Sequence, residues 1–157
     1  MPSIPPSGPL VRETGDVSEA CPGCGAVLAA LPGAAPAHPG ASASCARLFE
    51  VTVRGLREEA EADPAAVPVV RLADAAYDAQ HPVPDDPARL AAALAFLADA
   101  FGTRPSGTPS FTGGAPTVWR TTVTDAAADL DVIDLHVLLD TWARSVHEDW
   151  ARLVHGH

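Results

Sequence analysis

The residues of this sequence with the clearest chemistry are three cysteines in its first third. Cys21 and Cys24 belong to the run Cys-Pro-Gly-Cys-Gly, and twenty residues separate Cys24 from Cys45. Two thiolates three positions apart can hold one ion from a tight turn. Gly23 and Gly25 let the backbone curl so that its N–H groups point at the sulfurs. Because soft sulfur ligands favour zinc over calcium or magnesium, the spacing predicts a zinc site.

The fourth ligand of such a site is open between two histidines, since a structural zinc ion takes four protein ligands. His38 lies in the same loop, in the pattern C-x2-C-x13-H-x6-C, and would close the site locally. His81 directly precedes Pro82, at the end of a predicted helix, and would tie the loop to the helical body. We favour His81, because the loop has few apolar anchors of its own, and keep His38 as the alternative. The candidate metal ligands are therefore Cys21, Cys24, Cys45, His81 and His38.

Two other interpretations of the cysteines are weaker. A redox-active Cys-x-x-Cys motif needs a strand before it and a helix directly after it. Here a proline-rich tail precedes the motif and the run Leu31-Pro32-Gly33 follows it. Unrelated cysteines in a loop are the second alternative, which a third cysteine and two histidines within reach make less attractive.

The predicted site leaves two functions open, and the sequence does not decide whether the protein is an enzyme. A closed site with four protein ligands would indicate a zinc-stabilised domain that acts by protein interaction or regulation. Three ligands and an open position would indicate a small hydrolase-like metalloenzyme with a zinc-bound water. In that case His38, Tyr77 or His81 would assist, since Tyr77 lies one helical turn before His81.

Helices must position these residues, and the sequence predicts a mainly α fold of about four helices packed as a small bundle, with an N-terminal cysteine-rich zinc-binding loop. Serine and aspartate caps, together with prolines, set the expected helix boundaries. A short strand is also predicted, directly after a long loop over residues 102–117 that is rich in Gly, Pro, Ser and Thr. The expected elements are helices from about Ser42 to Asp63, Val67 to Gln80, Asp86 to Phe101 and Val132 to His155, and a strand from Val118 to Val123.

The final helix carries the longest apolar face of the chain. Its expected buried residues recur at helical spacing and include two of the three tryptophans. This face predicts that the helix packs along the rest of the bundle. The residues are Leu135, Leu138, Leu139, Trp142, Val146, Trp150 and Leu153.

The composition fits one domain and excludes some partners. The chain has 157 residues, and we expect a disordered tail over residues 1–18 and a single helical domain over residues 19–157, with the zinc-binding loop at 19–45. A formal net charge of −10 disfavours binding to nucleic acid. No apolar run approaches the roughly 20 residues that cross a bilayer, so we expect no membrane partner. The protein partner and the oligomeric state stay unknown.

The N-terminal residues and the composition also indicate a compartment and a source. The N-terminus lacks the basic start and apolar stretch of a secretory signal, so we expect a cytoplasmic protein. All ten basic residues are arginine, and alanine is abundant. We interpret both features as codon bias in a high-GC bacterial genome.

The joint order of these motifs resembles an uncharacterised bacterial family, domain of unknown function 5946, over residues 20–155. The resemblance implies a shared fold and metal site, and no reaction, since the family has no assigned activity. The sequence departs from the family pattern at Ala46, where an aromatic residue is usual, at Ala91–Ala93, where a histidine is usual, and at His147, where a tryptophan is usual. The residues that carry the resemblance are Cys21-Pro22-Gly23-Cys24-Gly25, Ala37-His38, Ser44-Cys45, Tyr77, Gln80-His81-Pro82, Trp142-Ala143-Arg144-Ser145-Val146 and Trp150.

Overall fold

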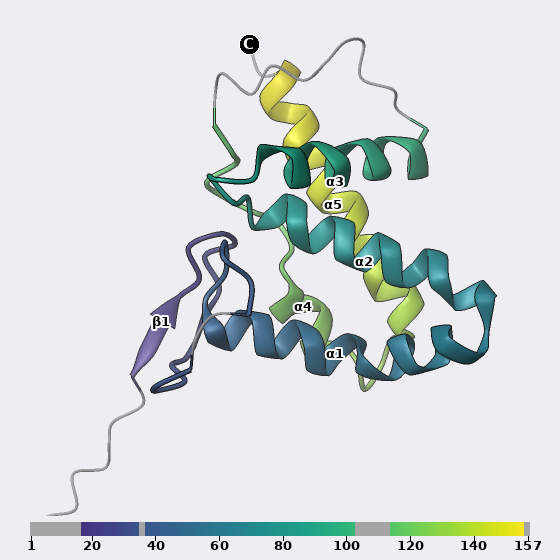
Figure 1. The fold of residues 1–157 in the computed structure, drawn as a ribbon, viewed down its shortest axis with the longest axis horizontal. Helices are drawn as coiled ribbons and strands as arrows, with labels where there is room; N and C mark the ends of the chain where they lie inside the picture. Colours follow the sequence, from purple (N-terminus) through teal and green to yellow (C-terminus); the bar gives the residue numbers. More distant parts are fainter. Residues whose placement is uncertain (1–16, 35–36, 103–113, 156–157) are drawn as a thin grey trace, which may run out of the picture.

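The fold is mainly helical, as the sequence predicts. The structure, a computed structural model, describes residues 17–34, 37–102 and 114–155 (Figure 1). Most of the expected N-terminal tail therefore lies outside the described residues. The elements are β1 Ser18–Ala20, β2 Val27–Ala29, α1 Ala43–Ala62, a 3-10 turn Pro64–Ala66, α2 Val67–Gln80, α3 Pro87–Ala100, α4 Val123–Ala128 and α5 Leu135–His155.

Local side-chain caps fix where the first and third helices begin. The Ser42 hydroxyl accepts a hydrogen bond from the Cys45 backbone N–H at 3.2 Å, and α1 starts directly after Ser42. The Asp86 carboxylate accepts from the Arg89 N–H at 3.1 Å, and Pro87 occupies the first position of α3. Both caps satisfy N–H groups that have no partner inside the helix, so sequence alone locates these boundaries.

Helix α2 is the centre of the bundle. It packs against α1, α3 and α5, and lies between α1 and α3 with α5 crossing behind it (Figure 1). An aromatic stack joins three of these helices: the Phe49 ring of α1 lies 4.1 Å from the Tyr77 ring of α2 and 6.0 Å from the Trp142 ring of α5. All three side chains are buried. The C-terminal end of α2 is therefore held in place by its neighbours.

Helix α5 buries most of its predicted face. Leu139, Trp142, Val146 and Trp150 are all in the core. Leu153 is 49% exposed and lies near the C-terminal end of α5, which ends at His155. Among the described residues, no helix combines the length and the apolar composition that crossing a bilayer requires.

In the C-terminal half of the chain, two elements differ from the sequence-based prediction. The predicted strand from Val118 to Val123 is wrong: no strand forms there, and the short helix α4 begins at Val123 instead. A capping box, in which Thr122 and Asp125 satisfy one another's backbone N–H groups, starts this helix. Helix α5 begins at Leu135, later than predicted, because the Asp134 carboxylate accepts from the His136 N–H at 2.9 Å.

Candidate metal centre

Four side chains converge at the junction of the N-terminal loop with α1 and α2. The ligand atoms of Cys21, Cys24, Cys45 and His81 all lie within 4.8 Å of one another, and each of these residues is at most 7% exposed. Three sulfurs and one imidazole form a donor set typical of structural zinc. The structure thus brings together the three predicted cysteines and one of the two predicted histidines, in a group that could hold a metal ion.

The spacing of the donor atoms fits a tetrahedral ion. The Cys24 and Cys45 sulfurs are 3.8 Å apart, and the Cys45 sulfur is 3.4 Å from the His81 Nε2. A tetrahedral zinc ion with bonds of about 2.3 Å to sulfur and about 2.0 Å to nitrogen needs edges of about 3.8 Å and about 3.5 Å. These two separations match a tetrahedral site, and the remaining donor pairs lie within 4.8 Å of one another.

A small hairpin presents the first two cysteines. Strands β1 and β2 pair antiparallel, with Ala20 opposite Val27, and the Cys-x-x-Cys run forms the turn between them. The Gly25 N–H donates to the Cys21 carbonyl at 2.9 Å, and Gly25 has φ +75°, a left-handed conformation that favours glycine. The sequence predicts a loop here and does not reveal the strands, because strands of three residues are too short to show an alternating pattern.

Cys45 comes from the first turn of α1, where the helix dipole stabilises a thiolate. The same capping residue serves two cysteines: the Ser42 hydroxyl accepts from the Cys45 N–H, and the Ser42 N–H lies 3.4 Å from the Cys21 sulfur and donates to it. The start of α1 therefore fixes Cys45 and neutralises part of the negative charge on Cys21.

His81 is oriented by the helix that it ends. Its Nδ1 lies 2.7 Å from the Tyr77 carbonyl oxygen, which can only accept, so Nδ1 carries the proton. The lone pair of Nε2 is then free to face the sulfurs. The Tyr77 ring stacks on the imidazole at 4.0 Å between ring centroids, which holds the ring plane. A histidine fixed through its second nitrogen is the arrangement that metal-binding histidines usually adopt.

The three buried cysteines cannot all ionise without a nearby positive charge. Hydrogen bonds from Cys24 and Cys45 lower the pKa of Cys21. The hydrogen bond with Cys21 raises the pKa of Cys24 to about 11 and also raises that of Cys45. Burial raises the pKa of Tyr77, so its hydroxyl stays protonated and donates to the Cys45 sulfur at 3.4 Å. Without a cation, these directions favour one thiolate, on Cys21, that accepts hydrogen bonds from the thiols of the other two cysteines. A bound dication would allow all three cysteines to ionise.

His38, the alternative ligand, lies outside the four-residue group. Its Nε2 lies 2.9 Å from the Asp78 carboxylate, and its Nδ1 accepts from the Gly40 N–H at 3.1 Å. Both ring nitrogens therefore have partners within the chain. The His38 ring centroid is 5.9 Å from that of His81, so it packs beside the group and fastens the loop to α2.

Two glycines allow the loop to approach the end of α2. A Cβ at Gly23 would come within 3.0 Å of the His81 ring and of two backbone oxygens, and a Cβ at Gly40 would collide with the backbone of His81 and Pro82. Backbone cannot move aside as a flexible side chain can. These positions therefore require glycine for a steric reason, although neither has a positive φ.

We expect Gly40→Ala to destabilise the protein by about 1–3 kcal/mol, the usual cost of overpacking a tightly packed site. Gly55→Ala is the matched control, because a Cβ there meets nothing within 4 Å and alanine favours a helix. Urea unfolding of both variants measures the difference. Equal or higher stability of Gly40→Ala would contradict the close approach.

The indole N–H groups of all three tryptophans form hydrogen bonds to residues next to the four donors. The sequence predicts only that two of these tryptophans, Trp142 and Trp150, lie in the core. The Trp119 indole N–H donates to the Gly23 carbonyl at 2.9 Å, and the Trp150 N–H donates to the Ala79 carbonyl at 2.9 Å. The Trp142 N–H lies 3.2 Å from the Gln80 amide oxygen. Two backbone carbonyls and one amide oxygen close to the four donors thus accept from indoles that come from distant segments.

Comparison with known proteins gives a family and no activity. The model of a family of unknown function, DUF5946, matches residues 19–108, which include all four converging residues and His38. No curated protein and no solved structure matches the chain. The chemistry of the site must therefore be argued from its geometry.

Proposed function

We propose that this chain, which belongs to the family of unknown function DUF5946, holds one zinc ion through Cys21, Cys24, Cys45 and His81, and that the ion is structural. The observation that carries the proposal is the set of three sulfurs and one nitrogen, all within 4.8 Å and all buried. Thiolate and imidazole ligands select zinc over the hard cations. The three cysteines form no disulfide in the structure, which leaves all three sulfurs available as ligands.

The structural role follows from what the four ligands connect. Two come from the hairpin, one from the start of α1 and one from the end of α2. The hairpin strands are only partly buried, so they have little apolar contact of their own to hold them on the bundle. One ion would therefore join three segments that hydrophobic packing joins weakly, and its binding free energy would contribute to folding.

A metalloenzyme is less well supported by the same geometry. Catalytic zinc keeps one coordination position for water, whereas here four protein donors converge. The groups that could assist a reaction are also engaged: the Tyr77 hydroxyl donates to Cys45, and both nitrogens of His38 have partners. We therefore propose that the domain acts through protein interaction or regulation.

The proposed setting is the reducing cytoplasm, because free thiolate ligands survive there. Nucleic acid is not a proposed partner, since the net charge of −10 repels phosphate. A membrane is not a proposed partner either.

We expect protein purified without added metal to contain one zinc ion per chain. Elemental analysis by mass spectrometry, with the protein concentration from absorbance, measures the ratio. A double variant, Cys21→Ser with Cys24→Ser, is expected to contain none, because it removes half of the donors. A folded wild-type protein with no metal would refute the proposal, and bound iron in place of zinc would refute the identity of the ion.

A further inference from the structure

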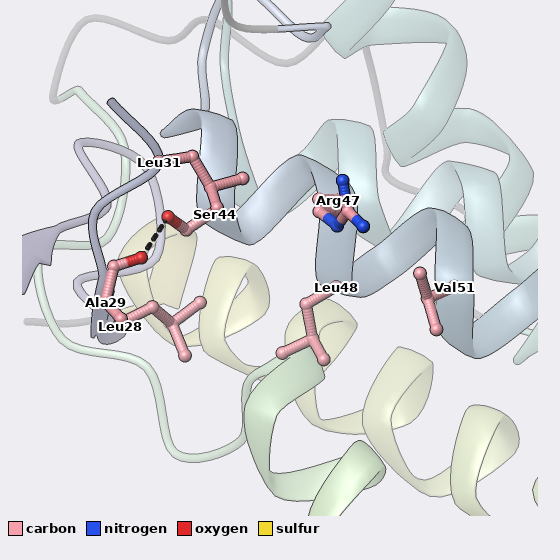
Figure 2. Close-up of a pocket in the computed structure, with 7 residues that line it drawn as sticks. All are labelled: Leu28, Ala29, Leu31, Ser44, Arg47, Leu48 and Val51. Atoms are coloured by element: carbon pink, nitrogen blue, oxygen red, sulfur yellow. Dashed lines mark hydrogen bonds between the residues drawn. The ribbon is translucent and has the colours of Figure 1, made fainter. Parts of the chain in front are cut away.

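The outer face of α1 forms an apolar groove beside the hairpin. The groove has a volume of about 290 Å³ and lies between β2, the turn after it and the first half of the helix (Figure 2). Figure 2 shows the side chains of Leu28, Leu48 and Val51 along it, with Arg47 at its rim. Val51 is 50% exposed, an unusual fraction for a valine in a helix that otherwise packs well. The lining residues are Leu28, Ala29, Leu31, Ser44, Arg47, Leu48 and Val51.

The face of α1 that lines the groove continues along the helix to Gly55, and we call this face the stripe. Ser44, Leu48, Val51 and Gly55 recur at i, i+4, i+7 and i+11, so they share one face of α1. A Cβ at Gly55 would meet nothing within 4 Å, and glycine is among the least favourable residues inside a helix. Packing within the described chain therefore gives no reason for this glycine, whereas a closely approaching partner would.

Two cations flank this stripe without partners. Arg47 and Arg54 lie seven residues, or two turns, apart on the same side of α1, and neither forms an ion pair with any residue that the structure describes. By contrast, Arg57 on the same helix pairs with Glu50 and Asp74. In a chain with a net charge of −10, most surfaces of a second copy are acidic, so unpaired arginines beside an apolar groove favour an acidic and apolar occupant.

The chain itself contains a segment of that chemistry, which we call the acidic-apolar segment, residues 129–137. Val132 is 81% exposed and Val137 is 55% exposed, so much of both side chains stays uncovered by their own chain. Asp129 and Asp131 flank Leu130 and directly precede Val132, and within the described part of the chain neither carboxylate has an ion-pair partner. The segment covers the connection from α4 to α5 and the first turn of α5. Exposed apolar side chains gathered in one place are unfavourable in water, so they often mark an interaction site.

We propose that the groove on α1 binds the acidic-apolar segment of a second copy of this chain. Val132 and Val137 would cover Leu48 and Val51, and the carboxylates of Asp129 and Asp131 would pair with Arg47 and Arg54. If two copies are related by a two-fold axis, the groove of each copy binds the segment of the other, an arrangement that we call segment exchange. Each dimer then contains the same contact twice, so the buried surface doubles. The inference uses no metal ligand and stands independently of the proposed zinc.

Sedimentation velocity over a range of concentrations tests the proposal. We expect wild-type protein to dimerise, and we expect Val51→Asp in the groove and Val132→Asp in the segment each to raise the dimer dissociation constant at least tenfold. Leu153→Asp is the matched control, because Leu153 is 49% exposed and belongs to the last turns of α5, whose C-terminal end lies on the opposite side of the fold from α1 (Figure 1). Unchanged zinc content and melting temperature in each variant show that the fold is intact.

Mixing the two variants separates segment exchange from any other dimer. A heterodimer of Val51→Asp with Val132→Asp keeps one intact contact of the two, so the mixture should dimerise more tightly than either variant alone. A wild-type monomer at 100 µM, or dimers that neither variant weakens relative to Leu153→Asp, would overturn the proposal. A mixture no tighter than its components would also overturn the exchange.

Discussion

Cys45→Ser should cost the protein both its metal and much of its stability. Cys45 is fully buried, and its sulfur lies within reach of the Cys24 sulfur, the His81 imidazole and the Tyr77 hydroxyl. Serine is nearly isosteric but does not ionise to a soft ligand. Apparent zinc-binding free energies of about 10–16 kcal/mol in small zinc domains compare with total stabilities of about 5–15 kcal/mol, so loss of the ion is a large fraction of the whole.

The expected fall in melting temperature is more than about 10 °C, since 1 kcal/mol corresponds to about 2–4 °C in a domain of this size. Circular dichroism melts of wild type and variant, each with and without a strong chelator, provide the measurement. The wild type should lose stability on chelation, whereas Cys45→Ser, already without metal, should not respond. A wild type whose melting is insensitive to chelation would show that no ion contributes to folding.

The second large effect distinguishes the two candidate histidines. His81→Ala removes a nitrogen that faces the sulfurs and should lower zinc affinity by more than about 100-fold, because even groups that only orient a ligand contribute about 10–100-fold. It also frees the hairpin from α2, so the melting temperature should fall together with the zinc content.

His38→Ala is the matched comparison, because His38 is also buried and its ring also contacts the Tyr77 ring, at 5.2 Å between centroids. It removes the hydrogen bonds to Asp78 and from Gly40, a loss of about 1–3 kcal/mol, while the four donors stay in place. We therefore expect a lower melting temperature with one zinc still bound. Zinc titration with a competing chromophoric chelator compares the variants. Zinc retention in His81→Ala and loss in His38→Ala would reverse the assignment.

The sequence by itself determined the features that depend on near neighbours. The spacing of Cys21 and Cys24 within one turn indicates a shared ion, and capping by Ser42 and Asp86 locates helix starts, because these interactions span only a few residues. The mainly α class follows from the same periodic patterns. That the cysteine group binds zinc stays a prediction until the metal is measured.

Only the tertiary structure decided which histidine joins the cysteines. Cys45 and His81 are 36 residues apart, and their 3.4 Å approach depends on how α1 packs against α2. The need for glycine at Gly23 and Gly40 has the same origin, since it arises from backbone that arrives from another segment. A sequence pattern describes which faces are apolar, but the distance between two faces is set by the packing of every side chain between them.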